Sequence, residues 1–361
     1  MDFHALYWYA AVIVGAFIGW KVLTYGMRPN NIPPGPPTIP LLGNLHQMPL
    51  KDFHFKFREW AQQYGLIVTL KVGGQNLILL NDESVIKDLL EERSNIYSAR
   101  PDLFIREFGD NMNIAFRKDT QWNTLLGFIK AMILYPEAQA EAQREIDRIV
   151  GFDRLPAWED RESLPYIRGV VEESLRWMPT TLSAAVPHSL LKDDYYNSYL
   201  IPKGSSMFIN VWTLNNNVKD NPRVFDPARH NPESTAQENY GIDTDSSKRP
   251  HFTFGAGRRV CPGFHIAERG LFIAISRLLW AFSFSRKLDN AGNIIPIDRD
   301  AVTPGFIVRP VPYPAVIKPR DQGSAKIIRE TWKEAQNSLD ADGNFTEEFF
   351  ERVFVSKTKN P

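Results

Sequence analysis

The chain has 361 residues with 42 basic and 42 acidic side chains, so it has no net charge and gives no reason to expect a nucleic-acid partner. Hydrophobic residues make up 43% of the sequence, and the length allows a large core in one or two domains. The single cysteine, Cys261, excludes a disulfide framework within the chain, which fits a reducing cytosolic environment.

The N-terminal segment, residues 1–27, is predicted to be a membrane anchor. Residues 5–20 carry no charge and have aromatic side chains at both ends, as interfacial aromatics do. This stretch is short for a span, but the aliphatic stem of Lys21 can extend it. Because Lys21 and Arg28 follow the stretch whereas Asp2 precedes it, the rest of the chain is expected to stay in the cytoplasm. A cleaved signal peptide is the alternative, although no basic start or small-x-small site is present.

The following segments predict a hinge and then the first elements of a folded body. Residues 28–40 contain NNIPPGPPTIP, which is typical of a stiff, extended linker. Residues 52–65 predict a helix that is closed by Gly65, with a core-facing apolar stripe that consists of Phe53, Phe57, Trp60, Ala61 and Tyr64. Residues 67–72 and 76–80 flank two glycines and predict a β-hairpin, and Asp82 is expected to cap a helix that runs to Ser94.

Two further helices are predicted in the middle of the chain. Residues 136–150 begin with proline and end before Gly151, which is typical of a helix. Residues 166–178 predict a second helix on which Glu173 and Arg176 share one face. Such a pair is usually solvated, so its meaning depends on what lies elsewhere in the chain.

The segment around the only cysteine, FGAGRRVCPG at residues 254–263, is suited to a thiolate. A cysteine binds metal as its thiolate, and the positive charge of Arg258 and Arg259 favours that form. Pro262 precedes an apolar stretch, residues 264–285, that predicts a long helix. The cysteine therefore lies before a helix N-terminus, which also stabilises an anion.

This segment resembles the haem-binding signature of the cytochrome P450 family. The pattern FxxGxRxC with a second glycine two residues later is filled by Phe254, Gly257, Arg259, Cys261 and Gly263. The resemblance implies that these residues bind haem b (iron protoporphyrin IX). Cys261 would be the axial ligand of the iron, and Arg259 would reach a haem propionate. A thiolate ligand favours cleavage of the O–O bond, which is the chemistry that the resemblance implies.

Three other segments resemble parts of the same family. Glu173 and Arg176 match its ExxR motif, which is structural. Arg229 in FDPARHNPE matches the third member of that triad, although Ala228 and His230 replace the usual glutamate and phenylalanine. Residues 184–212 resemble the strand region under the haem edge, where His188 would bind the second propionate. A histidine satisfied by ordinary polar contacts is the alternative. Lys203-Gly204 is expected to form a hairpin turn between Tyr199 and a strand at residues 206–211.

The order of the family is interrupted near residues 116–123. Residues 123–137 resemble the end of the central helix that crosses the oxygen side of the haem. A count back from them puts Asp119 and Thr120 on the catalytic acid-alcohol pair that guides protons. Trp122 can instead match the tryptophan of an earlier helix, but the basic partner four residues later is missing. Either alignment implies a deletion of roof helices that leaves the chain about a quarter short of a complete domain.

We therefore expect a mainly α fold with small β-sheets, namely an incomplete cytochrome P450 fold whose distal helices are largely missing. Residues 41–320 would form the haem-thiolate domain and residues 321–361 a C-terminal helical tail. The expected function is a fungal-type monooxygenase that oxidises an apolar small molecule, plausibly in secondary metabolism. Its partners would be NADPH-cytochrome reductase and the endoplasmic reticulum membrane, crossed once with the body in the cytoplasm. The alternative is a truncated, non-catalytic haem-binding protein that keeps only the proximal cradle.

The tail contains a sequence that partly matches a calcium loop, residues 340–351. Gly343 stands at position 4 of this loop, and Phe345 occupies position 6, where the sharp turn requires glycine. We therefore predict a solvated helix start that is capped by Thr346 or Asn344.

Overall fold

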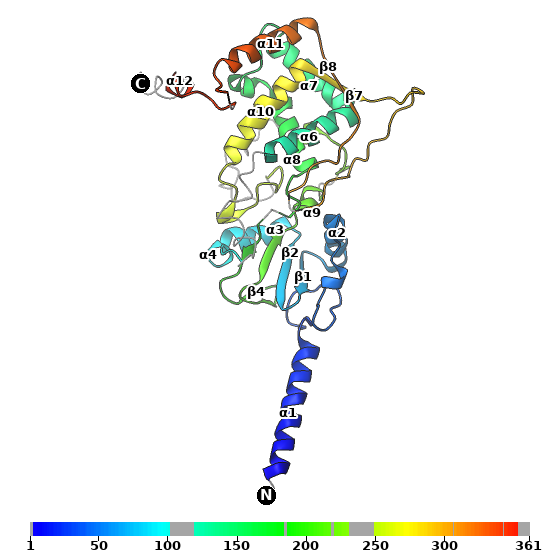
Figure 1. Cartoon of the computed structure of the whole chain (residues 1–361), viewed down its shortest axis with the longest axis vertical. Helices are drawn as coiled ribbons and strands as arrows, with labels where there is room; N and C mark the ends of the chain where they lie inside the picture. The colour runs from blue at the N-terminus through cyan, green and yellow to red at the C-terminus, as the bar shows by residue number, and fades with distance from the viewer. Residues whose placement is uncertain are drawn as a thin grey trace.

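The computed structural model describes residues 3–101, 119–183, 186–217, 220–230, 249–305, 307–341 and 343–352. Among these residues the chain forms a mainly helical body with small sheets, as predicted, and helix α1 (Phe3–Thr24) projects from one end of it (Figure 1). The four-stranded sheet and one two-stranded sheet lie at the end of the body next to α1, whereas the other two-stranded sheet and most of the long helices lie at the opposite end (Figure 1).

The longer helices of the body are α2 (Phe53–Tyr64), α6 (Asp119–Leu134), α7 (Pro136–Ile149), α8 (Pro165–Trp177), α10 (Phe264–Ala281) and α11 (Gln322–Gln336). Short helices are η1 (Leu45–Gln47), α3 (Glu83–Ile86), η2 (Lys87–Glu92), α4 (Ser94–Tyr97), η4 (Trp158–Ser163), α9 (Val211–Asn215), η5 (Pro227–Arg229), η8 (Gly257–Arg259) and α12 (Glu347–Phe350). The strands are β1 (Ile67–Val72), β2 (Gln75–Leu80), β3 (His188–Ser189), β4 (Asp194–Tyr196), β5 (Tyr199–Ile201), β6 (Ser206–Ile209), β7 (Phe282–Arg286) and β8 (Ala315–Pro319).

The main sheet has the strand order β1-β2-β6-β3, and the predicted hairpin of β1 and β2 is confirmed. Strand β6 runs parallel to β2, with Leu80 opposite Ile209. The predicted hairpin through Lys203-Gly204 is wrong, because β5 pairs with β4 in a separate sheet. The Gly204 amide donates instead to the carbonyl oxygen of Leu190 (2.8 Å), so the turn carries the chain from one sheet into the other.

The core of the helical part lies between α6, α7, α8 and α10. Its largest fully buried side chains include Trp177, Trp280, Phe128 and Phe272. The Trp280 indole donates to the carbonyl oxygen of Gly151 (2.7 Å), which follows the predicted end of α7. A polar indole nitrogen therefore enters the core with its hydrogen bond satisfied.

Two predicted helices differ in the structure. The helix expected over residues 264–285 ends at Ala281, because Phe282-Ser283-Phe284-Ser285 alternates with the period of a strand and pairs with β8. The helix expected from Asp82 to Ser94 is divided into α3, η2 and α4. Asp82 caps it as predicted, but wider π-helical turns interrupt it after Ile86.

The proline-rich hinge is packed on the main sheet instead of spanning open solvent. The Thr69 amide of β1 donates to the carbonyl oxygen of Pro34 (2.8 Å), and a Cβ on Gly35 would lie 2.0 Å from the Thr69 oxygen. The buried Asn44 side chain donates to the carbonyl oxygens of Pro36 (3.2 Å) and Pro37 (3.0 Å). Proline carbonyls that have no helix or strand partner of their own are thus satisfied by the body.

The tail beyond β8 forms α11 and the single turn α12. The Thr346 hydroxyl accepts from the amide of Phe349, which confirms one of the two predicted caps. Within the described part of the chain no group of three acidic, histidine or cysteine side chains is arranged to hold a metal ion. Asp342 of the calcium-like loop lies outside the described residues.

Candidate functional site

Cys261 lies directly before the first turn of α10. Its thiol is free and partly buried, its amide donates to the carbonyl oxygen of Phe254 (2.9 Å), and its own carbonyl accepts from Phe264 (3.4 Å). The sulfur is therefore held at the positive end of an 18-residue helix by a closed loop. Cys261 therefore lies before a helix N-terminus as the sequence predicted, and its role as a thiolate ligand stays a prediction.

The glycines of the signature have different roles in the structure. Gly257 has a φ of +63°, and a Cβ there would lie 1.9 Å from the Leu90 carbonyl oxygen, so its first role is to let the loop pack against η2. Gly263 stands at the N-cap of α10, where the Cys261 sulfur, at 3.9 Å, is the near neighbour of an added Cβ. A larger residue at Gly263 would crowd the approach to the sulfur.

Two arginines and a histidine gather around the end of α4. The Arg259 Nε donates to the carbonyl oxygen of Ser98 (2.9 Å), and the His188 Nδ1 lies 3.1 Å from that of Tyr97. The Arg100 guanidinium donates to the carbonyl oxygens of Val186 (2.8 Å) and Pro187 (2.9 Å). The sequence analysis identified Arg259 and His188 but missed Arg100. The sequence feature that could have indicated it is an arginine directly before Pro101, shortly after the end of α4.

The electrostatics of this cradle, defined as Arg100, His188 and Arg259, favour an anionic guest. Burial, together with the charges of Arg100 and Arg259, lowers the pKa of His188 to about 4, against a raising effect of the Tyr97 carbonyl. Burial and Arg259 also lower the pKa of Arg100. Within the described residues none of the three is paired with a carboxylate. Carboxylates of a ligand would supply the missing countercharge, so the residues present fit a haem with its two propionates.

The predicted Glu173–Arg176 pair is buried in α8. The Glu173 carboxylate accepts from Arg176 Nε (2.6 Å) and Nη2 (2.7 Å), and from Arg229 Nε (3.3 Å), as the resemblance implied. It also accepts from His230 Nε2 (2.8 Å), a partner that the sequence analysis did not foresee. Burial pushes the pKa of Glu173 upward, but the hydrogen bonds from Arg176 and His230 outweigh it and lower the pKa to about 2.

The loop that leads to Cys261 is attached to α8 and α9. The Thr253 hydroxyl donates to the Leu175 carbonyl oxygen (2.8 Å), and the amide of Phe252 donates to the Asn215 side chain (2.9 Å). The buried His251 Nε2 lies 3.3 Å from the carboxylate of Glu172 in α8. Because these contacts join the loop to the core helices, the position of the thiol is set by the core.

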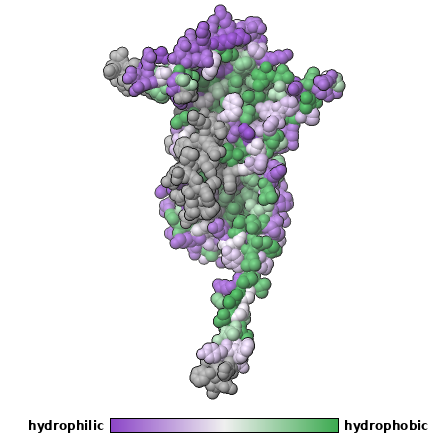
Figure 2. Space-filling model, in the orientation of Figure 1, coloured by the Kyte–Doolittle hydropathy of each residue, from purple (hydrophilic) through white to green (hydrophobic). Residues whose placement is uncertain are grey.

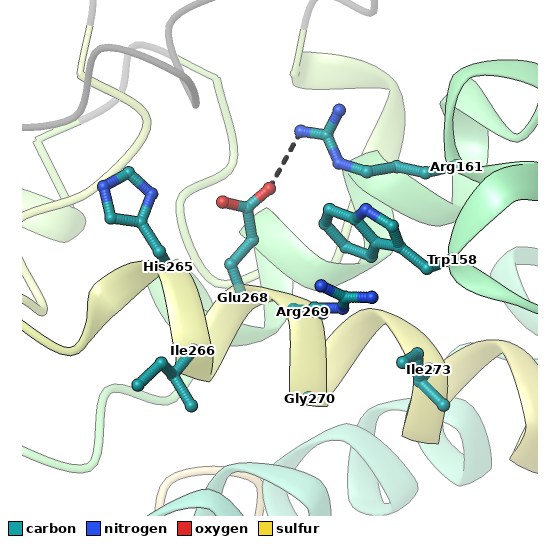
Figure 3. Close-up of a pocket in the computed structure, with 8 residues that line it drawn as sticks. All are labelled: Trp158, Arg161, His265, Ile266, Glu268, Arg269, Gly270 and Ile273. Atoms are coloured by element: carbon teal, nitrogen blue, oxygen red, sulfur yellow. Dashed lines mark hydrogen bonds and ion pairs between the residues drawn. The ribbon is translucent and has the colours of Figure 1, made fainter. Parts of the chain in front are cut away.

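A groove of about 550 Å³ opens beside α10, between its residues His265–Ile273 and η4 (Figure 3). Glu268 points across it to Arg161 of η4 (2.8 Å), and burial raises the pKa of Glu268. The guanidinium groups of Arg161 and Arg269 lie 5.4 and 5.1 Å from the Trp158 ring centre. The groove thus combines the charged side chains of Arg161, Glu268 and Arg269 with an apolar lining from Trp158, Ile266 and Ile273.

The predicted distal pair, Asp119 and Thr120, stands at the first turn of α6, but these side chains lie outside the described residues. The rest of α6 packs into the helical core through Phe128, while Trp122 is 57% exposed. Lys130 is fully buried, where its Nζ donates to the Ala301 carbonyl oxygen (3.3 Å), and burial lowers its pKa to about 8. The assignment of Asp119 and Thr120 stays a prediction.

Comparison with known proteins gives a consistent result. The family model described as Cytochrome P450 matches residues 33–128 and 118–314. The cytochrome P450 monooxygenase virE of Hypocrea virens is 29% identical over 509 residues, which cover 90% of this chain and 92% of that protein. The monooxygenase yanC of Aspergillus niger is 42% identical over 226 residues, 61% of this chain and 42% of that protein. In structure, a zebrafish cytochrome P450 solved with abiraterone has a TM-score of 0.60 at 17% identity, covering 74% of this chain and 99% of that one.

The two segments matched by the family model overlap at residues 118–128. The alignment with the Hypocrea virens protein runs over 509 residues, although this chain has 361. The chain therefore lacks an internal block that this relative contains, in agreement with the predicted junction at residues 116–123. Residues 118–128 are thus matched by both segments of the family model, in agreement with the two alignments that the sequence supported there.

Proposed function

The chain belongs to the cytochrome P450 family, and from that premise we propose that it is a haem-thiolate monooxygenase that oxidises an apolar small molecule in fungal secondary metabolism. Its fungal relatives are named as cytochrome P450 monooxygenases, which supports the reaction class. The cofactor in this proposal is haem b. The substrate class in this proposal follows from the resemblance to the family, which also implies that the roof helices of the substrate chamber are largely missing from this chain.

The observation that carries the proposal is the pairing of a thiol at a helix N-terminus with a cationic cradle. Cys261 would hold the iron, and Arg100, His188 and Arg259 would bind the two propionates. A haem iron with a thiolate ligand activates dioxygen. The Cys261 sulfur lies before the N-terminus of α10, and the Gly263 N-cap leaves its approach open. Asp119 and Thr120 would pass protons from solvent to the site.

The electron donor in this proposal is NADPH-cytochrome reductase. Exposed basic side chains surround the outer side of the Cys261 loop, namely Arg258, His265 and Arg269. Positive charge of this kind favours encounter with an acidic electron-donor surface. The groove on α10 lies within the same face and offers room for a partner side chain.

The body is proposed to work on the cytoplasmic face of the endoplasmic reticulum, held by α1 as a single span. Residues Tyr7–Thr24 are long and apolar enough to cross a bilayer, and they are not buried by the body. Lys21 lies over the rings of Phe17 (5.6 Å) and Trp20 (5.3 Å), an arrangement suited to the interfacial zone. The basic residues that follow the helix favour a cytoplasmic body.

The decisive experiment is the carbon-monoxide difference spectrum of the full chain, reduced with dithionite after haem loading. We expect the strongly red-shifted Soret band of thiolate-ligated iron, and its loss in Cys261→Ser. Ser283→Ala, a change at an exposed strand position, is the control. A band typical of imidazole-ligated or free haem in the wild-type chain would contradict the proposal.

The second candidate function, a non-catalytic haem-binding protein, is favoured by the missing block and the overlapping matches at residues 118–128. A distal side without its helices admits water and positions substrate poorly. The two candidates differ in turnover. A thiolate spectrum together with reductase-dependent oxygen insertion into an added apolar substrate supports the monooxygenase. The same spectrum with NADPH consumed but no oxidised product supports the haem-binding protein.

A further inference from the structure

The groove between α10 and η4 has an apolar stripe on its α10 side. Ile266, Gly270 and Ile273 line it at positions i, i+4 and i+7, which lie on one face of a helix. Ile266 is 75% exposed, and Gly270 between the two isoleucines lets another backbone approach closely. An exposed apolar face of this kind is suited to receive a second apolar element.

Positive charge surrounds an indole ring in the same groove. The guanidinium groups of Arg161 and Arg269 lie 5.4 and 5.1 Å from the ring centre of Trp158, as cation–π partners do. Arg161 is paired with Glu268 (2.8 Å), whereas Arg269 is exposed and takes part in none of the ion pairs among the described residues. A guest that is both aromatic and acidic would therefore complement the groove.

The last described segment of the chain forms a small closed unit. We define this clip as residues 338–341 and 343–352, which lie beyond the residues that the family model matches. The Thr346 amide donates to the carbonyl oxygen of Ser338 (2.9 Å), and the Asp340 amide donates to that of Asn344 (2.8 Å). Because these bonds close the clip on itself directly after α11, it can change its position as one unit.

The surface of the clip is both aromatic and acidic. Phe345 stacks on Phe349 with 4.4 Å between the ring centres, and its ring lies 6.3 Å from that of Phe350. Phe345 and Phe350 nevertheless stay 50% and 49% exposed. Three exposed carboxylates accompany the rings, namely those of Glu347, Glu348 and Glu351. The clip thus has the chemistry that fits the groove, and both expose apolar surface to water.

Helix α11 carries the clip to the side of the body on which α10 begins in the view of Figure 1, where α12 stands apart from the body. The helix is fixed on the core through Ile327 and Ile328, and its 15 residues span about 22 Å. Figure 2 shows mainly hydrophilic residues along α11, at the top of the view, so this helix is a solvated arm. Because clip and groove belong to one chain, their effective concentration is high, on the order of millimolar for a short connection.

We propose that the groove is a docking site for the clip of the same chain, with the phenylalanine rings against Ile266 and Ile273 and the carboxylates beside Arg269. The groove volume of about 550 Å³ lies within the range of sites that enclose a ligand. The structure holds the open clip, and the docked clip is a second state of the chain. The consequence rests on the proposed function, because a docked clip would cover part of the basic face where we place the electron donor and would slow electron delivery.

The test uses the full chain in detergent with the photoreactive amino acid p-benzoylphenylalanine in place of Phe350, followed by irradiation, digestion and mass spectrometry. We expect cross-links from this position to residues 158–161 or 265–273 within one chain. The matched control carries the same group in place of Trp332, which is 58% exposed on α11 and should give no cross-link to the groove. A lack of groove cross-links from the clip, or groove cross-links only between two chains, would overturn the proposal.

A second variant tests the charge pairing. Arg269→Gln removes the exposed cation of the groove, so the yield of groove cross-links should fall about two- to fivefold. Lys318→Gln, an exposed change on β8, is the control and should leave the yield unaltered. An equal yield in both variants would mean that Arg269 does not bind the clip, and the charge pairing would be wrong.

Removal of the clip by a stop after Asn337 tests the consequence in the haem-loaded chain. We expect reduction of the iron by NADPH-cytochrome reductase to become faster, and an unchanged rate would overturn the covering of the donor face. The cross-link requires neither haem nor a reductase. Failure of the docking and failure of the proposed function therefore give different results.

Discussion

At the residue scale, the Glu173 carboxylate joins segments that lie far apart in the sequence. It is fully buried and accepts hydrogen bonds from Arg176 on its own helix and from Arg229 and His230, more than fifty residues later. A buried charge is tolerated only with such partners, and removing one partner leaves the others uncompensated. The network holds α8 against the segment that follows α9.

We predict that Glu173→Gln lowers the free energy of unfolding by about 3 to 5 kcal/mol, because Arg176, Arg229 and His230 lose their shared anion. Denaturant unfolding of the full chain in detergent measures this change. Glu141→Gln is the control, since it removes an exposed carboxylate whose pair with Arg144 contributes little. Equal effects of the two substitutions would contradict the importance of the network.

The cradle gives a second prediction at this scale. Arg100→Gln keeps a polar side chain but removes a propionate charge partner, so haem transfer to apomyoglobin should become about tenfold faster. Arg258→Gln, an exposed change in the same loop as Arg259, should leave the transfer rate unaltered. An unchanged rate of haem transfer from the Arg100→Gln variant would show that this arginine does not bind a propionate.

The sequence pointed to Cys261 and Arg259 because their motif is local, ten residues that specify their own loop. Arg100 and His230 were missed because their roles arise only when distant segments meet. Arg100 binds carbonyls of residues 186–187, and His230 reaches a carboxylate on α8. Because the partners are far apart in the sequence, no local motif indicates either contact.

At the scale of elements, a buried histidine of α2, His54, lies in the contact between α2 and α9. His54 is 1% exposed, and its ring lies 4.7 Å from that of Trp212. Neither ring nitrogen has a hydrogen-bond partner among the described residues. Burial lowers the pKa of His54 to about 4, with a further lowering by Arg223 and opposing effects of Asp52 and Asp300.

This histidine predicts a pH dependence. The unfolded chain binds a proton at His54 near pH 6.5 and the folded chain only near pH 4, so folding stability is lost as the pH falls between these values. We expect His54→Phe to reduce that loss by about 3 kcal/mol. Unfolding free energies measured from pH 7 to pH 4 test this, with His46→Gln, an exposed histidine, as the control. The pH range in which His54 changes the folding stability lies above the range for Glu173, whose pKa is lowered from 4.5 to about 2.

Elements with one clear periodicity were predicted well, and transitions between periodicities were not. The apolar stripe of α2 and the proline start of α7 identified both helices. The end of α10 was placed too late, because Phe282 and Phe284 extend an apolar run whose change to a strand depends on β8, more than thirty residues later. Pairing of β6 with β2 is likewise a long-range choice that a local turn signal cannot report.

At the scale of the whole molecule, the hinge decides how the anchor and the body are joined. Composition alone indicated a stiff linker, and only the structure reveals its contacts with β1. Asn44 is central to them, because its side chain also accepts from the Lys71 amide (2.8 Å). The residues that bind the hinge come from the sheet, so their partnership could not be inferred from the proline run itself.

We predict that Asn44→Ala frees the hinge, because three hydrogen bonds of a fully buried side chain are lost. Unfolding should cost about 2 kcal/mol less, and protease cleavage within residues 28–40 should accelerate. Gln47→Ala is the control, since it removes one exposed bond to the same Pro37 carbonyl. A hinge that is cut equally fast in both variants would show that Asn44 does not hold it.

The docked hinge has a mechanical consequence. The 22 residues of α1 span about 33 Å, close to the thickness of a hydrocarbon core, so in the proposed anchored state the helix would tilt when the bilayer becomes thinner. The Leu41 amide donates to the Tyr25 carbonyl oxygen, and Gly26 packs closely against Leu41 and Gly43. Because of these contacts, we expect the helix and the body to change their orientation together. In the proposed anchored state, the thickness of the membrane would therefore change the angle between the proposed haem cradle and the lipid surface.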